Sequence, residues 1–462
     1  MTPRKLNILL LGSGGRECAI AWKMAQSSLL GNLYIAPGNA GTARYGTNLS
    51  LDPCDFAAVG QAALENHIDM LVVGSEAPLV AGIADHFHAT AELSHIAVIG
   101  PGQAAAQLEG SKEFAKRFML RHDIPTARHL AVTADNLAEG LALLDTLEAP
   151  YVLKADGLAA GKGVLIIDGL DQAKQALKDM LGGMFGDAGN TVVIEEYLYG
   201  VECSAFVITD GKDYRLLSCA KDYKRVGEGD TGPNTGGMGS VSPPAFITED
   251  TARRIEERVI RPTIEGLRAE GLPYCGFIFF GLMIDYDGNP KVIEYNVRLG
   301  DPETESLMPR LKTDLVELLH ASAVGRLGEM PVEFVPDVAA TVILVSDGYP
   351  GACRKGLPII GLDTEMENVV VFHAGTKADD GRVVTSGGRV LAVTALAPTL
   401  PDALTMAYRR AGQIRFEGVA YRRDIGSDID DPYANRTPDF VRRAKNQATL
   451  YTADYNTKHN RN

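Results

Sequence analysis

The first hundred residues alternate between short apolar runs and segments with helical patterns. Short apolar runs bounded by turn residues are typical of buried strands. Strand–helix–strand alternation predicts a doubly wound α/β domain with a parallel sheet, which we expect over residues 1–108. The expected strands are Leu6–Leu11, Leu33–Ala36, Met70–Val73 and Ile96–Ile99, and the expected helices include Glu17–Gln26 and Phe56–Asn66.

The pattern changes in a second region, residues 109–328, where strands are joined by glycine-rich connections. We expect strands at Tyr151–Ala155, Val164–Ile167, Val192–Glu196 and Cys203–Thr209, followed by a helix over Glu249–Glu270. Residues 227–240 are glycine-dense and are expected to form a long binding or lid loop. The pair Asp287-Gly288 predicts a hairpin turn between strands Gly276–Asp285 and Lys291–Asn296.

A third, smaller α/β unit is expected over residues 329–430. It has β-like runs at Ala339–Val345, Val369–His373 and Val390–Ala395, and a helix near Pro401–Ile414. Residues 431–462 are polar and show no obvious periodicity. We therefore expect these last residues to be a poorly ordered tail.

Composition narrows the possible functions. The 462 residues suggest about three domains, and 45% hydrophobic with 23% charged residues is an ordinary globular mixture. The formal net charge of −14 disfavours a protein that neutralises nucleic-acid phosphates, so we expect small-molecule partners. No apolar run is long enough for a membrane-spanning helix. Six scattered cysteines without a C-x-x-C pair indicate reduced thiols and a cytoplasmic protein.

A glycine-rich loop, Gly12-Ser-Gly-Gly15, lies directly between the first expected strand and helix. Such loops let an anion approach the backbone at a helix N-terminus. The third glycine of the dinucleotide motif is replaced by Glu17, and the second strand ends in Pro37-Gly38-Asn39 without the acidic residue that would hold a ribose. A substrate phosphate, a structural turn and an NAD site all stay possible for this loop.

A second loop, running from Lys154 to Gly163, differs from a P-loop. Three residues separate Gly157 from Gly161, Gly163 stands where a P-loop has Ser or Thr, and a strand follows instead of a helix. A glycine-rich connection between two strands, with lysines at both ends, can close over a triphosphate. We interpret it as a flap; the alternative is a solvated hairpin.

Two strand segments carry further candidate chemistry. Side chains alternate along a strand, which places Glu294, Asn296 and Arg298 on one face. Carboxylate and amide oxygens suit Mg²⁺ carrying nucleotide phosphates, and a guanidinium can hold a transferring phosphoryl group. An exposed polar edge is the alternative. Glu195 to Leu198 end an apolar run, where free backbone groups could pair with an adenine edge.

Taken together, the motifs resemble ATP-grasp ligases, and more narrowly the phosphoribosylamine–glycine ligase family. The resemblance covers about residues 5–430. It is carried by the flap KADGLAAGKGV, the segments IEEYL, DTGPNTGGMG and VIEYNVRLGDPE, and the segments GSGGRE, APGNAGTA and GSKEFAKRF. It implies a central ATP-grasp domain over 109–328 with a mobile lid subdomain at about 126–198. The implied reaction joins glycine to 5-phosphoribosylamine through a glycyl phosphate, in the second step of purine synthesis.

The resemblance also implies roles for individual residues, with ATP as co-substrate and Mg²⁺ or Mn²⁺ as the metal. Lys154 and Arg298 would be catalytic, and Glu294 and Asn296 would bind the metal. ATP would be bound by Lys112, Lys154, Gly161, Lys162, Gly163, Glu195, Glu196, Tyr197, Leu198 and Glu202. The substrates would be bound by Gly12, Gly14, Gly15, Asn39, Asp222, Gly236, Gly237, Met238, Arg298 and Asp301.

The sequence departs from the family pattern at Cys18, where family members usually carry histidine; we expect Cys18 to be a packing residue. A nucleotide-binding regulator should lack the face of Glu294, Asn296 and Arg298, which is intact here. An NAD-dependent oxidoreductase is disfavoured by Glu17. Another ATP-grasp ligase, acting on a different acid and amine, stays possible. We expect a monomer without nucleic-acid or membrane partners.

Overall fold

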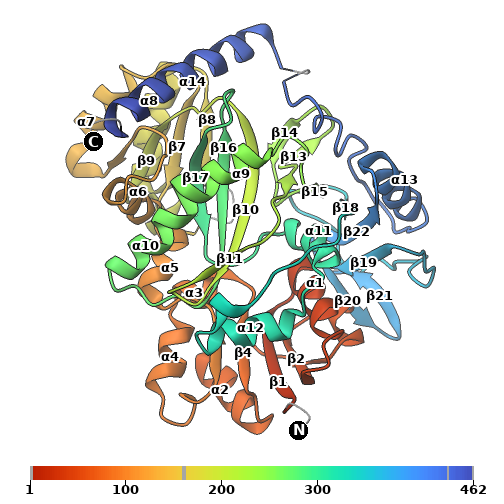
Figure 1. Ribbon diagram of the computed structural model, residues 1–462. Coiled ribbons are helices and arrows are strands. Elements are labelled where there is room, and N and C mark those ends of the chain that lie inside the picture. Colours follow the sequence, from red (N-terminus) through yellow and green to blue (C-terminus); the bar gives the residue numbers. More distant parts are fainter. Residues whose placement is uncertain (1–3, 159–162, 434–435, 460–462) are drawn as a thin grey trace.

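The computed structural model describes residues 4–158, 163–433 and 436–459 (Figure 1). The N-terminal domain has the predicted parallel sheet, in the order β3-β2-β1-β4-β5. Ile8 and Leu10 pack on one face of the sheet and Leu9 and Leu11 on the other, as expected for a doubly wound sheet. The strands are β1 (Leu6–Gly12), β2 (Leu30–Pro37), β3 (Thr47–Asn48), β4 (Met70–Val73) and β5 (Ala97–Ile99); the helices are α1 (Gly15–Met24), α2 (Phe56–Glu65), α3 (Glu76–Val80), α4 (Ile83–Ala89) and α5 (Gln103–Gly110).

The segment expected to be the lid forms an antiparallel sheet in the order β6-β9-β7-β8. Its helices cover a separate small core that includes Leu144, Leu153, Leu177 and Ile194. Because this core belongs to the lid alone, the lid is a distinct packing unit. The elements are β6 (His129–Val132), α7 (Leu137–Leu144), β7 (Tyr151–Ala155), β8 (Val164–Ile167), α8 (Leu170–Asp179) and β9 (Val192–Glu196).

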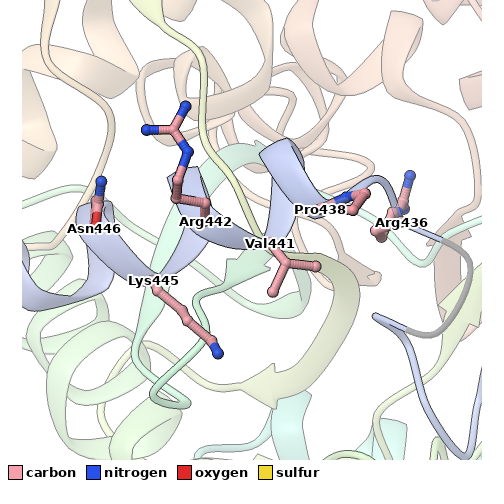
Figure 2. A pocket seen from close by; sticks show the side chains of 6 residues that line it. All are labelled: Arg436, Pro438, Val441, Arg442, Lys445 and Asn446. Carbon is pink, nitrogen blue, oxygen red and sulfur yellow. The ribbon is translucent and has the colours of Figure 1, made fainter.

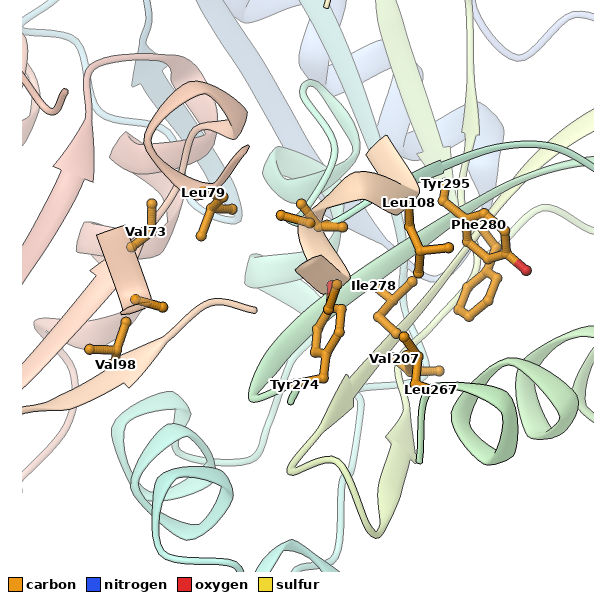
Figure 3. Packing of buried hydrophobic residues seen from close by; sticks show 14 of the residues in the cluster. Val73, Leu79, Val98, Leu108, Val207, Leu267, Tyr274, Ile278, Phe280 and Tyr295 are labelled. Carbon is orange, nitrogen blue, oxygen red and sulfur yellow. The ribbon is translucent and has the colours of Figure 1, made fainter. Parts of the chain in front are cut away.

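The central sheet, in the order β11-β10-β16-β17, is antiparallel, and β16 and β17 form the predicted hairpin. A continuous apolar cluster joins it to the N-terminal domain: Val73 and Val98 lie in the same cluster as Ile278 and Phe280 (Figure 3). The elements are α6 (Lys112–Arg121), β10 (Val201–Thr209), β11 (Tyr214–Leu216), α9 (Glu249–Ile255), α10 (Arg261–Ala269), β16 (Gly276–Ile284), β17 (Pro290–Asn296), α11 (Glu303–Arg310) and α12 (Leu315–Ala323).

The C-terminal sheet crosses the boundary expected at residues 328/329. Its order is β12-β15-β18-β22-β19, so two strands from the second region pair with three from the third. The expected loop 227–240 is partly a β13–β14 hairpin. The elements are β12 (Lys221–Asp222), β13 (Arg225–Gly227), β14 (Thr231–Asn234), β15 (Gly239–Ser242), β18 (Val338–Val345), β19 (Val369–His373), β20 (Thr376–Asp379), β21 (Arg382–Thr385), β22 (Arg389–Ala397) and α13 (Leu400–Ala411).

Most of the segment expected to be a poorly ordered tail is helical in the structure. Residues Pro438–His459 form helix α14, which lies across the lid (Figure 1). Ala444 and Ala448 are fully buried, and Phe440, Gln447 and Tyr451 are half-buried at the intervening helical positions. This spacing of three and four is a helical period, but its small and polar members hide it from a hydrophobicity pattern. No helix among the described residues is long and apolar enough to cross a membrane.

Candidate active site

A buried group of three charges lies where the lid meets α6. Glu195, at the end of β9, is 2.9 Å from the Lys154 ammonium on β7 and 3.0 Å from the Lys116 ammonium on α6. Burial opposes the charge of Glu195, but the two ammonium groups outweigh it and lower its pKa. Burial also lowers the pKa of Lys116 to about 8. The Glu195 side chain therefore fixes the two lysines. The role of residue 195 beside adenine, which the resemblance implies, stays a prediction.

The motifs did not identify Lys116 as a site residue, although it lies one helical turn after Lys112 on α6. Lys112 donates from its ammonium to the carbonyl oxygens of Ala155 and Gly157, at 2.9 Å each. Burial lowers the pKa of Lys112. Lys112 thereby ties the start of the flap to α6. Gly161 and Lys162 of the flap lie outside the described residues, and the carbonyl of Gly163 accepts from Ala155 at 2.8 Å.

The predicted metal ligands share one side of β17, two residues apart. Glu294 pairs with Gly281 on β16, and a Cβ atom there would lie 2.9 Å from Glu294 Cγ, so the glycine leaves room for the carboxylate. Asn296 is buried, and its Nδ2 has no hydrogen-bond partner among the described residues. In the described part of the chain, no group of three or more His, Cys, Asp or Glu side chains is arranged to hold a metal ion. One carboxylate and one amide oxygen fit Mg²⁺ that is also bound by phosphates.

Arg298 is not on the strand face predicted for it, because β17 ends at Asn296 and the chain turns. Its guanidinium lies 2.9 Å from Glu109 and 3.6 Å from Glu76, two carboxylates of the N-terminal domain. Glu109 also accepts from the Val297 N–H at 2.7 Å. Arg298 is therefore held at the junction of the two domains. Its acidic partners, far away in sequence, carry no motif that could have identified them.

The segment after β9 provides the candidate base-binding edge. Leu198 is buried, and Tyr197 stacks edge-on against Tyr199 at 4.9 Å. The Glu196 carboxylate accepts from the Arg128 N–H at 3.0 Å, which fixes the end of the lid sheet. The backbone of Tyr197 and Tyr199 also hydrogen-bonds to Gln447, a residue outside the motifs.

Glu202 and Asp222 form a second polar group on β10 and β12. The Lys224 ammonium, 2.9 Å from Glu202, lowers the pKa of that carboxyl. Burial raises the pKa of Asp222. The pKa of the neighbouring Glu303 is raised to about 7, mainly by burial and also by the charge of Asp222. Lys224 and Glu303 are thus further candidates that the motifs did not identify.

A polar pocket of about 350 Å³ lies between the glycine-rich loop and the C-terminal domain. Three predicted substrate residues, Gly14, Asn39 and Asp301, line it together with Arg389 from β22. Arg389 pairs with the Asp301 carboxylate at 3.0 Å and donates to the Gly236 carbonyl at 2.5 Å. The remaining lining residues are Ser13, Gly38, Tyr349, Ala374, Gly375, Thr376 and Ser386. The pocket contains a cation and several hydroxyls, which suit an anionic polyol such as a sugar phosphate.

The glycine-rich loop packs against acidic side chains of its own chain. The Gly14 N–H donates to Glu17 at 2.6 Å, and the Arg16 N–H donates to Asp301 at 3.3 Å. A Cβ atom on Gly15 would clash with the Glu305 carboxylate, so this glycine is required for close packing. Gly12 has a φ of +132°, a conformation that favours glycine. The structure thus gives the glycines a packing role beside any contact with substrate.

Other predicted substrate residues differ in what they offer. The Asn39 amide donates to the carbonyls of Ser13 and His373, which joins the loop to the C-terminal domain. Gly237 has a φ of +118°. The Met238 side chain is buried in the core, so it cannot touch a substrate in this conformation. Cys18 is buried in α1, and burial raises the pKa of its thiol to about 12, as expected for a packing residue.

A second hollow, of about 480 Å³, lies along α14 (Figure 2). None of the predicted site residues that the structure describes lines it. Its lining residues are Arg436, Pro438, Val441, Arg442, Lys445 and Asn446. Its position is therefore separate from the charged groups described above.

Comparison with known proteins identifies the family. Models of phosphoribosylglycinamide synthetase match the chain with their N domain over residues 6–109, their ATP-grasp (A) domain over 110–304 and their C domain over 339–428. The chain belongs to the phosphoribosylglycinamide synthetase family. The predicted resemblance and the three-domain α/β fold are thereby confirmed, and the ATP-grasp domain indicates an enzyme that uses ATP. The alternative of an NAD-dependent oxidoreductase is wrong.

Individual relatives agree with this assignment. Phosphoribosylamine–glycine ligases of Pasteurella multocida and Salmonella typhimurium are each 48% identical over 91% of this chain, and the alignments cover 97% and 98% of those proteins. The crystal structure of the phosphoribosylamine–glycine ligase of Thermotoga maritima has a TM-score of 0.78 at 39% identity, covering 91% of this chain and all of that one. A Campylobacter jejuni biotin carboxylase, 16% identical, has a TM-score of 0.70 and covers 95% of this chain and 96% of its own, which shows a shared fold.

Proposed function

We propose that the chain joins glycine to 5-phosphoribosylamine with ATP, giving glycinamide ribonucleotide, ADP and phosphate. The observation that carries the proposal is the position of Asp301. It lines the polar pocket and follows, within a few residues, the strand that carries Glu294 and Asn296. A phosphorylated acid formed beside β17 would therefore lie close to an amine held in the pocket. The relatives named above, whose activity is that ligation, support the same assignment.

The proposed chemistry begins with the poor reactivity of the glycine carboxylate. One carboxylate oxygen attacks the γ-phosphorus of ATP, ADP leaves, and glycyl phosphate forms. The sugar amine then attacks the glycyl carbon, and inorganic phosphate leaves with that oxygen. The protein needs to supply positioning, charge neutralisation and exclusion of water, without a protein nucleophile.

The residues at hand fit these tasks. We assign Lys112 and Lys154 to the ATP phosphates, because both lie beside the flap and Glu195 orients Lys154. Glu294 and Asn296 would hold Mg²⁺ or Mn²⁺, which when bound would neutralise the phosphate charge. Arg298 lies at the junction of the domains, where it would face the transferring group. Gly161 to Gly163 would complete the flap.

The remaining assignments concern the base, the sugar and the amine substrate. The segment Tyr197–Leu198 would contact adenine, and Glu202 the ribose. Arg389 would bind the phosphate of the amine substrate, with Asn39 keeping the glycine-rich loop in place. The free, unpaired cysteines among the described residues support a cytoplasmic location.

Isotope transfer tests the proposed reaction. Glycine labelled with heavy oxygen in its carboxylate should give inorganic phosphate with one label per turnover, and the amide product should keep the other label. Mass spectrometry of the released phosphate measures this. Unlabelled phosphate would exclude an acyl phosphate intermediate. A panel of other acids and amines, assayed for phosphate release, would identify a different ligase if glycine is not the preferred acid.

A further inference from the structure

Helix α14 contacts both the lid and the β16–β17 hairpin. On the lid side, Arg443 donates to the Ala149 carbonyl at 3.0 Å, and the ring of Phe440 lies edge-on to Tyr199 at 5.3 Å. On the hairpin side, the Lys291 ammonium lies 5.1 Å from the centre of the Tyr451 ring. The family models end at residue 428, before this helix begins. The helix is thus an addition to the matched domains, placed across the segment that joins the lid to the central sheet.

Gln447 makes the most specific of these contacts. Its side-chain oxygen accepts from the Tyr199 N–H at 2.9 Å, and its side-chain nitrogen donates to the Tyr197 carbonyl at 3.1 Å. A neighbouring parallel strand bonds in the same way, with one residue taking the carbonyl before and the N–H after its opposite residue. The primary amide of Gln447 therefore replaces a strand on the outer edge of this segment.

This arrangement determines what the other edge presents. In extended backbone, successive residues direct their N–H and C=O groups to opposite sides. With Tyr197 and Tyr199 bonded to Gln447, the N–H and C=O of Leu198 face the opposite edge. Neither group bonds to another residue of the described part of the chain. That edge belongs to the segment following Glu195, which lies 2.9 Å from Lys154.

We propose that Gln447 is a positioning residue for adenine, because its amide holds Tyr197 and Tyr199 so that the backbone of Leu198 can pair with the base. This inference rests on the proposed use of ATP at this site. Adenine offers a ring nitrogen that accepts and an amino group that donates, and an N–H with a carbonyl on one strand edge matches both. Hypoxanthine reverses this pattern, with an N–H and a carbonyl in the corresponding positions. The consequence of losing Gln447 should therefore depend on the base.

The test compares three variants of the full-length enzyme. Gln447→Leu removes both hydrogen bonds at similar size. Gln447→Glu keeps an acceptor for the Tyr199 N–H but opposes the Tyr197 carbonyl with a second acceptor. Asn446→Leu makes the matched amide-to-leucine change at the exposed neighbouring position. Steady-state KM and kcat are measured for ATP, inosine triphosphate and glycine, with thermal melting as a separate measure of folding.

For Gln447→Leu we expect KM for ATP to rise about tenfold, the effect of one neutral hydrogen bond. The preference in kcat/KM for ATP over inosine triphosphate should fall by a similar factor, while KM for glycine stays within about twofold. In Gln447→Glu, KM for ATP and the base preference should change in the same direction. This variant provides the test if the leucine variant does not fold. Asn446→Leu should match the wild type. Loss of the base preference distinguishes positioning from simple support of the lid, which would lower the melting temperature alone.

An unchanged base preference and ATP KM in a folded Gln447 variant would overturn the inference, whatever its melting temperature. Failure of the proposed function looks different. In that case the wild-type enzyme itself would show no ATP-dependent ligation, and isothermal titration would detect no binding of ADP.

Discussion

Replacing Glu195 by glutamine should destabilise the lid, because it removes the negative charge between two buried lysines at nearly constant size. The carboxylate lies 2.9 Å from Lys154 and 3.0 Å from Lys116. Breaking a buried ion pair typically costs about 3–5 kcal/mol. For Lys116 the cost of losing its partner is limited, because its pKa is already about 8. Lys116 can instead release its proton, which at pH 7 costs only about 1.4 kcal/mol. We therefore expect the lower value, about 3 kcal/mol at pH 7.

The pH dependence of this loss has a defined sign. A lysine whose pKa is lower in the folded than in the unfolded chain penalises folding fully below its folded pKa, and the penalty shrinks as pH rises toward 10.5. In Glu195→Gln the folded pKa of Lys116 should fall below 8, so the variant starts to regain stability at a lower pH than the wild type. The difference between them should shrink by about 1 kcal/mol from pH 7 to pH 9.

Thermal melting followed by circular dichroism at both pH values measures this. For a domain of roughly 150–250 residues, a loss of about 3 kcal/mol corresponds to a decrease in melting temperature of roughly 6–12 °C. Glu139→Gln, an exposed charge removal on α7 of the same lid, is the matched control and should melt like the wild type. If Glu195→Gln melts within about 1 °C of the control at pH 7, the ion pairs of Glu195 with Lys116 and Lys154 do not stabilise the lid.

Three further changes separate the parts of the site. Glu294→Gln should lower kcat by about 10²-fold or more with unchanged melting, as expected for loss of a charge beside the metal; a near-normal rate in stopped-flow or steady-state assays would disprove this role. Arg389→Lys should raise KM for the amine substrate about tenfold and leave KM for ATP alone, because lysine cannot replace the paired contacts to Asp301 and Gly236; equal effects on both substrates would contradict the pocket assignment. Burial lowers the pKa of His373 to about 4, so its contribution to stability is present above pH 6.5 and is lost as pH falls. Between pH 7 and pH 5 the wild type should lose about 2 kcal/mol of folding stability that a His373→Gln variant does not lose. Urea unfolding at pH 7 and at pH 5 measures this difference.

The parts of the site that the sequence predicted are local in the chain. Glu294 and Asn296 are two residues apart on a strand, so period two places them together whatever the rest of the chain does. The two strands around the flap are likewise adjacent in sequence. The prediction for Arg298 extended the same period beyond Asn296, where β17 ends, and its partners became Glu109 and Glu76 instead.

Residues that come together across the fold left no signal in one sequence. Arg389 reaches the pocket because β22 belongs to a sheet that also contains strands of the preceding region. Lys116 had a local signal, one turn after Lys112 on the same helix, but its ion pair with Glu195 depends on how α6 packs against the lid. Helix α14 was missed because Ala444, Gln447 and Ala448 occupy its inner face in place of large apolar residues.

The distribution of cores indicates where the enzyme can change shape. The apolar cluster shared by the N-terminal and central sheets, together with the strands shared by the central and C-terminal regions, makes these parts hard to separate. The lid has its own core, and Glu195 with the segment after β9 joins it to the rest. Helix α14 contacts Ala149 on the lid and Lys291 on the hairpin. If the lid moves relative to the hairpin, α14 must therefore lose its contacts with one of them. Gln447 binds the segment after β9, which connects the lid to the central sheet.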